Sequence, residues 1–226
     1  MERLQLKNVG FIYKTAKDEK VIFREVNIEF KKGVLYGVIG ESGTGKTTLL
    51  SIVAGLDDRY SGELLYNGMD MRKMDLNEYR KKSISFITQK NNLLSHLSAL
   101  ENIEISVNLA GKSMSRKDIL DVLNKYGIDK KTATRRASEL SGGEQQRVAV
   151  AMAVCRDNDI IFADEPTASL DDANAENIVK ILKVLSQEGK CIIMATHNKK
   201  LLNYCDIVYR INCENKSIEM VRINVF

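Results

Sequence analysis

The sequence of 226 residues predicts an α/β fold, in which strands and helices alternate around a mostly parallel sheet that is covered on both faces. Three observations support this prediction. An apolar run at residues 34–39 leads directly into a glycine-rich loop at 40–48 and then into an apolar, helix-like segment. After residue 137, short apolar runs alternate with helical patterns. Polar residues suited to chemistry follow these runs, at the carboxyl ends of strands where such sheets bind ligands.

The N-terminal segment predicts antiparallel β structure ahead of the parallel core. Residues 3–9 alternate polar and apolar side chains, as a half-buried strand does. After a charged turn at 14–20, the alternation resumes from Val21 to Phe30 and ends at a Lys32-Gly33 turn. Tyr13, which follows the first run, suits either packing in this sheet or stacking on an adenine ring, and its spacing alone favours packing.

The glycine-rich loop matches the pattern G-x-x-x-x-G-K-[ST] in the strand–loop–helix context that a phosphate-binding loop requires. Its residues are Gly40, Glu41, Ser42, Gly43, Thr44, Gly45, Lys46, Thr47 and Thr48. Glycines let successive backbone N–H groups face a phosphate, and a helix that begins near Lys46 adds the positive end of its dipole. We expect Lys46 to reach the β- and γ-phosphates and the Thr47 hydroxyl to bind Mg²⁺. The alternative is a glycine-rich turn with a stray lysine, and the full match favours a nucleotide site.

The middle of the chain predicts a helical insertion within the α/β core. A strand at 83–87 ends at Gln89. Ser98 begins a helix that continues to Leu109, and a capping motif at Ser115 begins another. Residues 90–135 are therefore expected to form a helical subdomain.

From residue 137 onward, strands and helices alternate again. The predicted elements are, in order, a helix that Leu140–Gln145 opens and that runs to about Arg156, a strand at 159–164, a helix across 178–185, a strand at 191–195, a helical turn from Lys199, and strands at 207–211 and 218–221.

Two carboxylates, Asp164 and Glu165, end the apolar strand that begins at Asp159. Both should therefore emerge at the edge of the sheet that carries the phosphate loop. One carboxylate there can hold Mg²⁺ through water, and a second can orient or deprotonate an attacking water. The alternative is that acidic residues only mark the solvated end of a strand. A buried run leading into Asp-Glu-Pro, in a chain with a phosphate loop, favours the catalytic interpretation.

A second glycine-containing motif opens the helix that follows Leu140. Ser141 and Glu144 have the spacing of a helix capping box. A cap does not explain Gly142 and Gly143 in the first turn, where each glycine costs about 1 kcal/mol relative to alanine. Exposed backbone N–H groups at a helix N-terminus bind anions, so we expect the cap and an anion site together.

Gln89 and His197 end two further strands. A glutamine at the end of a strand is usually only a polar residue at the edge of the sheet, and a lone histidine is more often structural than catalytic. At a strand end that faces a γ-phosphate, however, His197 could donate a hydrogen bond to it and respond to its loss.

Composition is that of an ordinary globular protein, and we expect a single domain across residues 1–226. Hydrophobic residues make up 44% of the chain and charged residues 28%, and the net charge of +4 comes from 34 basic and 30 acidic residues that are well mixed. This balance does not favour a nucleic-acid partner. No apolar run approaches the roughly 20 residues that span a bilayer, and the N-terminus does not begin a signal peptide, so we expect a cytosolic protein. The cysteines at 155, 191, 205 and 213 lack metal-binding spacing, and we expect neither disulfides nor a structural metal.

The ordered set of motifs resembles that of ABC-type ATPase domains and covers nearly the whole chain. The resemblance is carried by the loop at 40–48, Gln89, Leu140–Arg147, Ile160–Pro166, Ala168–Asp171 and Thr196-His197. It implies a P-loop fold of the ABC type that binds ATP and Mg²⁺ and hydrolyses ATP.

The same resemblance implies a role for each matching residue. Residues 40–48 are expected to form the Walker A loop, and Gln89 to be the Q-loop residue that contacts the metal and the catalytic site. Asp164 is expected to be the Walker B aspartate, which binds the metal together with Thr47. Glu165 is expected to be the catalytic glutamate and His197 the switch histidine. Tyr13 matches the aromatic that stacks on adenine, which reverses the preference for packing.

The resemblance also implies a dimer that forms on ATP. In such a dimer Ser141, Gly142 and Gly143 of one subunit, with the neighbouring Glu144 and the D-loop residue Asp171, close on the ATP that the other subunit's phosphate loop holds. We expect the dimer to consist of two copies of this chain, with the γ-phosphate driving the closure.

Within the family, four segments resemble the ATPases of macrolide and peptide exporters, lipoprotein-release machines and peptide-antibiotic resistance transporters. These segments are Gly40–Gly43, Leu76–Arg80, Gln89–Asn102 and Asp164–Thr167. The partners of that branch are permeases of the four-helix type with a large extracytoplasmic domain. We therefore expect a cytoplasmic subunit, held at the inner face of the membrane by a separate permease, that drives export of a peptide, antibiotic or lipoprotein-type substrate.

The alternative is an ABC ATPase that drives conformational signalling through a membrane partner, in cell division or antibiotic sensing. ABC ATPases of DNA repair or translation fit badly, because they carry long coiled-coil insertions or tandem ATPase domains. The motif at Leu140–Gln145 disfavours an unrelated phosphate-loop kinase or GTPase.

Four positions are compared with the family pattern. Met152 stands where arginine is usual, and Asn158 replaces a common proline. Asn198 follows His197 where aspartate is common, and Glu144 stands where glutamine is also frequent. None of these changes removes a catalytic group, so we still expect an active ATPase.

Overall fold

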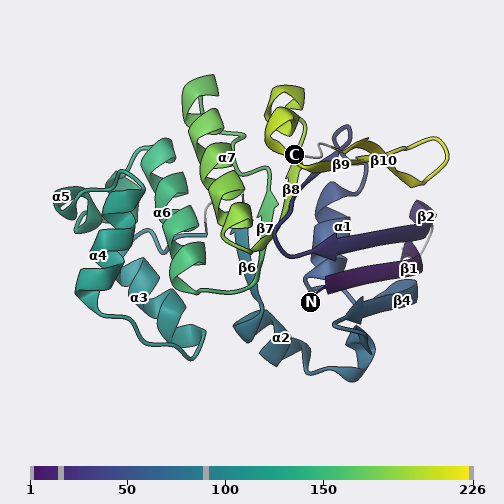
Figure 1. Ribbon diagram of the computed structural model, residues 1–226, viewed down its shortest axis with the longest axis horizontal. Coiled ribbons are helices and arrows are strands. Elements are labelled where there is room, and N and C mark those ends of the chain that lie inside the picture. The colour runs from purple at the N-terminus through teal and green to yellow at the C-terminus, as the bar shows by residue number, and fades with distance from the viewer. Residues whose placement is uncertain (1–2, 15–17, 89–91, 224–226) are drawn as a thin grey trace.

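Two β-sheets and a unit of helices make up the structure, a computed structural model that describes residues 3–14, 18–88 and 92–223 (Figure 1). The first sheet is antiparallel and has the order β2-β1-β4-β5, formed by β1 (Arg3–Lys14), β2 (Glu19–Lys31), β4 (Tyr60–Tyr66) and β5 (Met69–Asp70). The second sheet has the order β10-β9-β3-β8-β7-β6 and is parallel except for the β9–β10 pair. Its strands are β3 (Leu35–Ile39), β6 (Ile84–Thr88), β7 (Ile160–Asp164), β8 (Cys191–Thr196), β9 (Ile207–Ile211) and β10 (Ile218–Ile223).

The described helices are α1 (Lys46–Val53), α2 (Leu76–Lys82), α3 (Ala99–Leu109), α4 (Arg116–Lys125), α5 (Lys130–Ala133), α6 (Gly142–Cys155) and α7 (Asp172–Gln187), with 3₁₀ turns at Met71–Lys73, Ala137–Glu139 and Lys199–Tyr204. The predicted mixed, mostly parallel sheet with an antiparallel N-terminal part is confirmed. None of the helices in the described residues is long and apolar enough to cross a membrane.

The strands of the parallel sheet divide their side chains between two cores. In β7, Ile160 and Phe162 pack in the core that contains α1, whereas Ile161 and Ala163 pack in the core that contains α7. Strands buried on both faces read as continuous apolar runs, which is why the sequence shows β7 and β8 so clearly.

Helix α1 lies between the two sheets. Its apolar side chains Leu49, Leu50, Ile52 and Val53 are fully buried and pack against both the antiparallel strands and the parallel sheet. This packing fixes the N-terminal end of α1 at the carboxyl end of β3, where the glycine loop connects the two elements.

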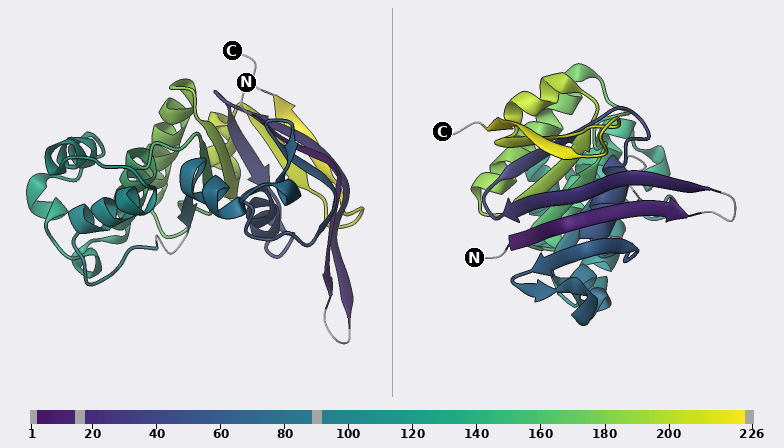
Figure 2. Two further views of the ribbon diagram at one scale, coloured as in Figure 1. Left: turned by 90° about the horizontal axis from the view of Figure 1, so that it is seen from below. Right: turned by 90° about the vertical axis from the view of Figure 1, so that its right-hand side faces the viewer.

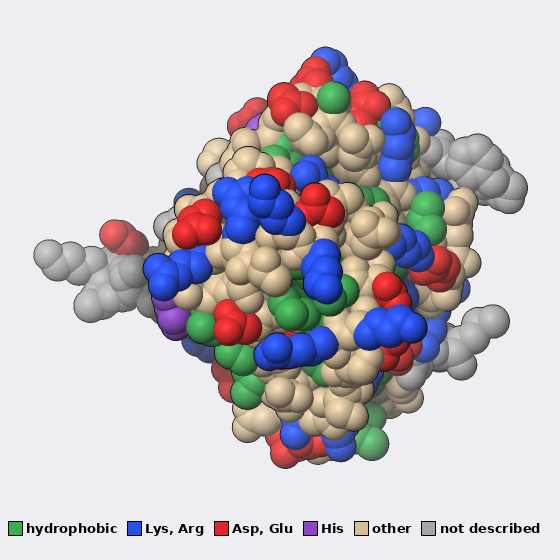
Figure 3. All heavy atoms as spheres, turned by 90° about the vertical axis from the view of Figure 1, so that its left-hand side faces the viewer, with side chains coloured by type: hydrophobic (Ala, Val, Ile, Leu, Met, Phe, Trp, Pro, Cys, Tyr) green, Lys and Arg blue, Asp and Glu red, His purple; other side chains and the backbone are tan. Residues whose placement is uncertain are grey.

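The helical unit forms one end of the molecule, with its own core of residues from α3, α4, α5 and α6 (Figure 1). Ser98 and Ser115 accept hydrogen bonds from the first turns of α3 and α4, which confirms both predicted starts. The unit is larger than the predicted insertion at 90–135, because α6 packs in the same core. Figure 3 shows that Lys and Arg side chains alternate with Asp and Glu across this end of the molecule.

The β1–β2 hairpin extends beyond the rest of the antiparallel sheet, as both views in Figure 2 show. The ladder between β1 and β4 ends with Phe11 opposite Tyr60, whereas the ladder between β1 and β2 continues to Lys14 opposite Glu19. Tyr13 therefore lies on a part of β1 that β4 does not reach.

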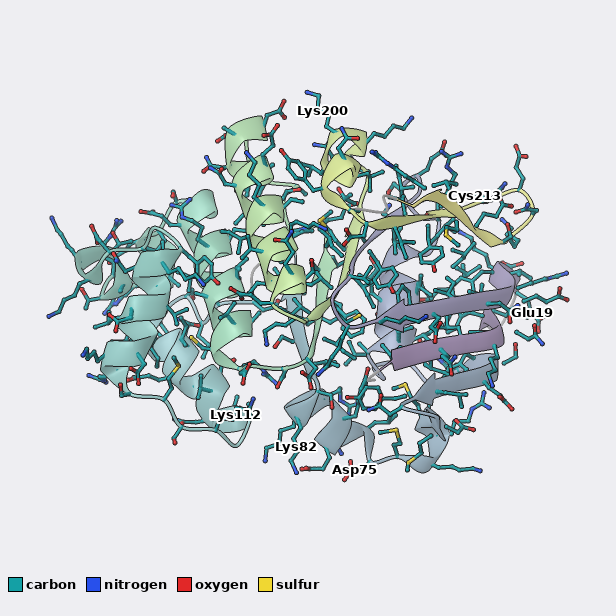
Figure 4. The ribbon with its side chains drawn as sticks, viewed as in Figure 1. Glu19, Asp75, Lys82, Lys112, Lys200 and Cys213 are labelled. Carbon is teal, nitrogen blue, oxygen red and sulfur yellow. The ribbon has the colours of Figure 1, made fainter. Side chains whose placement is uncertain are left out.

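The four cysteines are free thiols. Burial raises the pKa of Cys155, Cys191 and Cys205 to about 12, so these thiols are unreactive at neutral pH. Cys213, which Figure 4 labels, is exposed on the loop between β9 and β10.

Candidate functional site

A cavity of about 400 Å³ lies over the glycine loop. Its walls come from the loop and the start of α1, from Glu165 at the end of β7, and from Tyr13, Lys20 and Ile22 of the antiparallel hairpin. Six of the nine predicted loop residues therefore share one cavity with Tyr13, the exceptions being Gly40, Glu41 and Thr44. Sequence reasoning missed Lys20 and Ile22, although Lys20 is the cross-strand partner of Tyr13 and would follow from the hairpin register.

Two positions in the loop require glycine. A Cβ at Gly40 would lie 2.5 Å from Thr44 Oγ1, because the loop folds tightly over its own threonine. Gly45 has φ of +106°, and its Cβ would lie 2.3 Å from Ile22 Cγ2. The loop thus reaches its conformation by packing its backbone directly against the hairpin, with Gly45 at the N-terminus of α1.

Lys46 is buried, and its ammonium group is held within the loop. Its Nζ donates to the carbonyl oxygens of Gly40 at 2.8 Å and Glu41 at 3.0 Å, and lies 3.7 Å from Glu165 Oε1. The predicted phosphate-binding lysine therefore lies between the loop carbonyls and the carboxylate at the end of β7.

Thr47, which lines the cavity, is paired with Asp164, with Thr47 Oγ1 donating to Asp164 Oδ2 at 2.7 Å. Asp164 Oδ1 is buried and has no hydrogen-bond partner among the described residues. Burial is the main reason that the pKa of Asp164 is raised, although the Thr47 hydrogen bond opposes it. An orphaned carboxylate oxygen beside a hydroxyl suits a hard cation such as Mg²⁺, which prefers oxygen ligands. The residues present therefore fit the predicted metal.

Glu165 and His197 form a second pair at the ends of β7 and β8. His197 Nδ1 lies 3.0 Å from Glu165 Oε2, and the backbone N–H of His197 donates to the same oxygen at 3.3 Å. Glu165 has a φ of +48°, which is uncommon for a residue with a side chain. No local sequence pattern predicts this conformation, in which the carboxylate contacts both Lys46 and His197.

Gln89, predicted to contact the metal and the catalytic site, lies outside the described residues. The strand that leads to it, β6, ends at Thr88 beside Asp164 of β7.

The start of α6 has the predicted capping box. Ser141 Oγ accepts from Glu144 N at 3.3 Å, while the Glu144 carboxylate accepts from Ser141 N at 2.7 Å. The hydrogen bonds that the Ser141 backbone N–H and hydroxyl donate to the Glu144 carboxylate lower the pKa of Glu144. A Cβ at Gly142 would meet nothing within 4 Å, so the first turn of α6 leaves open space beside its backbone N–H groups. Both the cap and an open helix N-terminus are present.

Asp171 caps α7 by accepting from Asn174 N at 2.9 Å, and this hydrogen bond lowers its pKa. Neither Asp171 nor Ser141 is among the residues that line the cavity over the phosphate loop. Within one chain, Tyr13, loop residues and Glu165 line the cavity, and hydrogen bonds join Asp164 to Thr47 and His197 to Glu165. The motif at 141–144 does not line this cavity.

The chain is similar to several known proteins. A family model described as ABC transporter matches residues 23–168. The uncharacterized ABC transporter ATP-binding protein YclH of Bacillus subtilis is 40% identical over 94% of each chain. The lipoprotein-releasing system ATP-binding protein LolD of Francisella tularensis is 36% identical over 92% of this chain and 93% of its own. Among solved structures, a dimeric post-hydrolysis state of the ATP-binding cassette MJ0796, bound to ADP and Pi, has a TM-score of 0.88 and 31% identity and covers 99% of this chain and 100% of its own.

Proposed function

Because this chain belongs to the ABC transporter family and is one of its ATP-hydrolysing subunits, we propose that it works as an ATP-driven dimer at the inner face of the cell membrane. ATP closes two copies together, hydrolysis releases them, and this cycle drives a separate permease that exports a peptide, antibiotic or lipoprotein-type substrate. The observation that carries the proposal is that Lys46, Thr47 and Glu165 line one cavity, while Thr47 is hydrogen-bonded to Asp164 and Glu165 to His197.

Binding of the nucleotide rests on the loop and the hairpin. Tyr13 stacks on the adenine, and the phosphates lie along the loop toward the N-terminus of α1. Lys46 exchanges its hydrogen bonds with the Gly40 and Glu41 carbonyls for bonds with phosphate oxygens. Thr47 and Asp164 would hold Mg²⁺, which neutralises phosphate charge when bound.

Hydrolysis rests on Glu165. Its carboxylate accepts the proton of the attacking water, and the two contacts from His197 fix the direction in which Oε2 points. The positive φ of Glu165 supports this role, because strained residues cluster at functional sites.

The dimer completes each site in trans. Ser141 and Gly142 lie outside the cavity of their own chain and present an open helix N-terminus, which suits the γ-phosphate held by the partner copy. The relative MJ0796 has been solved as a dimer.

The in-trans role predicts that Ser141→Arg blocks dimerisation on ATP while monomer affinity for ATP stays nearly unchanged. Light scattering with Mg-ATP, in a Glu165→Gln background that slows hydrolysis, measures the association state. Ser113→Arg, an exposed serine elsewhere on the helical unit, is the matched control. A Ser141→Arg chain that still dimerises would refute the role.

The permease docks, in this proposal, in a groove of about 250 Å³ between β6 and α6. Its apolar lining includes Leu56, Phe86 and Met152, and its charged lining consists of Arg80 and Arg156. Arg156 Nε is buried without a hydrogen-bond partner in the described part of the chain. An amphipathic permease segment that carries a carboxylate matches this combination.

Two lysines on the groove's side of the molecule are each paired with a carboxylate, Lys82 with Glu78 and Lys112 with Asp157. Figure 4 shows Lys82 of α2 and Lys112 of the loop after α3 projecting from the same lower edge of the molecule. Lys112 Nζ donates to the backbone carbonyl of Arg156 at 2.6 Å, which joins that loop to the groove. Met152 contributes an apolar side chain to this groove, at a position where the family resemblance implies an arginine.

The docking proposal is tested by capture of the membrane partner. Tagged Glu165→Gln chain with Mg-ATP is used to purify partners from detergent-solubilised membranes of its host, and mass spectrometry identifies them. A permease should co-purify with the chain and with a Met220→Glu control on β10, but not with Met152→Glu. Recovery of soluble partners alone would remove the transporter function, and equal capture by both methionine variants would exclude the groove.

A further inference from the structure

Tyr13 has little support from its own sheet. The β1–β4 ladder ends at Phe11, so no residue of β4 pairs with Tyr13 in the described structure, and the tyrosine side chain is 39% exposed. Its ring meets the Phe11 ring edge-on, with centroids 4.9 Å apart and planes at 82°. Its hydroxyl lies 3.5 Å from Thr48 Oγ1 on α1. An exposed ring with contacts at its edge and tip needs a further contact to hold one orientation.

Arg59, the residue immediately before β4, supplies a further contact. Its guanidinium carbon lies 5.8 Å from the centroid of the Tyr13 ring and 5.9 Å from that of Phe11. Both distances fall within the range of about 6 Å at which an arginine is attracted to an aromatic face. Arg59 thus occupies the space beside Tyr13 that a longer β4 would fill.

Asp57 fixes the guanidinium in place. Arg59 Nε donates to Asp57 Oδ1 at 3.0 Å and Arg59 Nη2 to Oδ2 at 2.6 Å, which is a bidentate pair, and the Arg59 backbone N–H donates to Oδ1 at 3.0 Å. The Asp57 side chain is 14% exposed. The hydrogen bond from Arg59 lowers the pKa of Asp57, so the carboxylate stays ionised at neutral pH. A half-buried carboxylate therefore anchors the Arg59 side chain, which is itself 64% exposed.

We propose that Arg59, anchored by Asp57, is a positioning residue that holds the Tyr13 ring in place for the base of the nucleotide. This inference rests on the proposed function, in which Tyr13 stacks on adenine. Arg59 is not among the residues that line the cavity, so it acts through Tyr13 and not on the phosphates. A ring that is already ordered loses less conformational freedom when the base binds. The affinity gained through the base therefore increases, whereas the contribution of the phosphates does not change.

The test compares a ligand that has a base with one that has none. Calorimetry without magnesium gives the Kd of ATP and the Kd of inorganic tripolyphosphate for the wild type and for variants. Arg59→Ala should weaken ATP binding roughly two- to fivefold and leave tripolyphosphate unchanged. Arg59→Lys, which keeps the charge but not the bidentate pair, should restore part of the loss. In steady-state hydrolysis, Arg59→Ala should raise the KM for ATP without lowering kcat.

Two controls make the outcomes distinct. Arg72 lies over the Tyr60 ring at 4.4 Å in the same sheet, so Arg72→Ala removes a similar arginine–tyrosine contact away from Tyr13 and should not alter the ratio of the two Kd values. Tyr13→Ala should weaken ATP binding roughly tenfold or more, with tripolyphosphate again unaffected.

If Tyr13→Ala leaves the ratio of Kd values unchanged, both the stacking role and the inference are wrong. If Tyr13→Ala changes the ratio and Arg59→Ala does not, only the inference is wrong. The inference is also overturned if Arg59→Ala weakens both ligands equally, or lowers only the melting temperature, because Arg59 would then act on phosphate or on the turn alone.

Discussion

Replacement of Glu165 by glutamine separates hydrolysis from binding at this site. The glutamine is nearly isosteric, so it keeps the shape of the side chain, which is 17% exposed. It loses the negative charge that accepts a proton and that faces Lys46 at 3.7 Å. One of its two terminal atoms becomes an N–H donor, which cannot accept the hydrogen bonds that His197 directs at Oε2.

The size of the effect follows from the role of the carboxylate. Loss of a general base costs about 10²–10⁴-fold in rate, which corresponds to about 2.7–5.4 kcal/mol in the activation free energy. ATP binding should be retained or strengthened, because a negative charge is removed from the vicinity of the phosphates. The ATP-bound dimer should therefore accumulate.

The assay measures phosphate release at saturating Mg-ATP, together with size-exclusion chromatography of the ATP-bound chain. Glu63→Gln, at an exposed glutamate on β4, is the control for loss of one negative charge. A Glu165→Gln chain that hydrolyses ATP within a few-fold of the wild-type rate would show that another group accepts the proton.

Three further predictions concern the core and the loop. Phe162→Ala should lower the free energy of unfolding in urea by about 3–5 kcal/mol, because the ring is fully buried; a loss under about 1 kcal/mol would contradict this. Burial raises the pKa of Asp164 above the ordinary 3.8, so the folded chain binds this proton more tightly than the unfolded chain. Ionisation of Asp164 therefore lowers the free energy of unfolding as the pH rises. Asp164→Asn should thus raise the melting temperature of the nucleotide-free chain at pH 7, with the gain shrinking toward pH 4, and an unchanged or lower value at pH 7 would contradict it. Gly45→Ala, whose Cβ would lie 2.3 Å from Ile22 Cγ2, should abolish ATP binding by calorimetry, whereas Gly142→Ala should not.

Much of the fold could be predicted because its strongest signals are local. The β7 run is apolar on both faces, and the capping serines of α3 and α6 mark helix starts that the structure confirms. Helix α2 was missed because it is short and polar, with Tyr79 as its buried residue. Asp75, which accepts from Asn77 N and Glu78 N, is a capping signal that could have located it.

The site could be predicted as a set of residues but not as a geometry. Motif spacing placed Lys46, Asp164 and Glu165 at one edge of the sheet, since the carboxyl ends of parallel strands meet there. The left-handed backbone of Glu165 and the contacts between Lys46 and the loop carbonyls depend on the packed structure. The meeting of Arg59 with Tyr13 depends on long-range pairing of β1 with β4, which no local pattern specifies.

The two cores that share β7 also govern the direction of its terminal carboxylate. Both faces of the strand are apolar, so hydrophobicity alone would tolerate a shift by one residue. Side-chain size does not tolerate it, because such a shift would force Phe162 into the space that Ala163 occupies. Asp164 follows Phe162 and Ala163 directly, so the difference in their volumes, which fixes the register of β7, also fixes the direction in which the Asp164 side chain points. The large and small residues buried inside the sheet therefore also determine the direction of the carboxylate at its edge, and replacing Phe162 and Ala163 by residues of equal volume would remove this constraint.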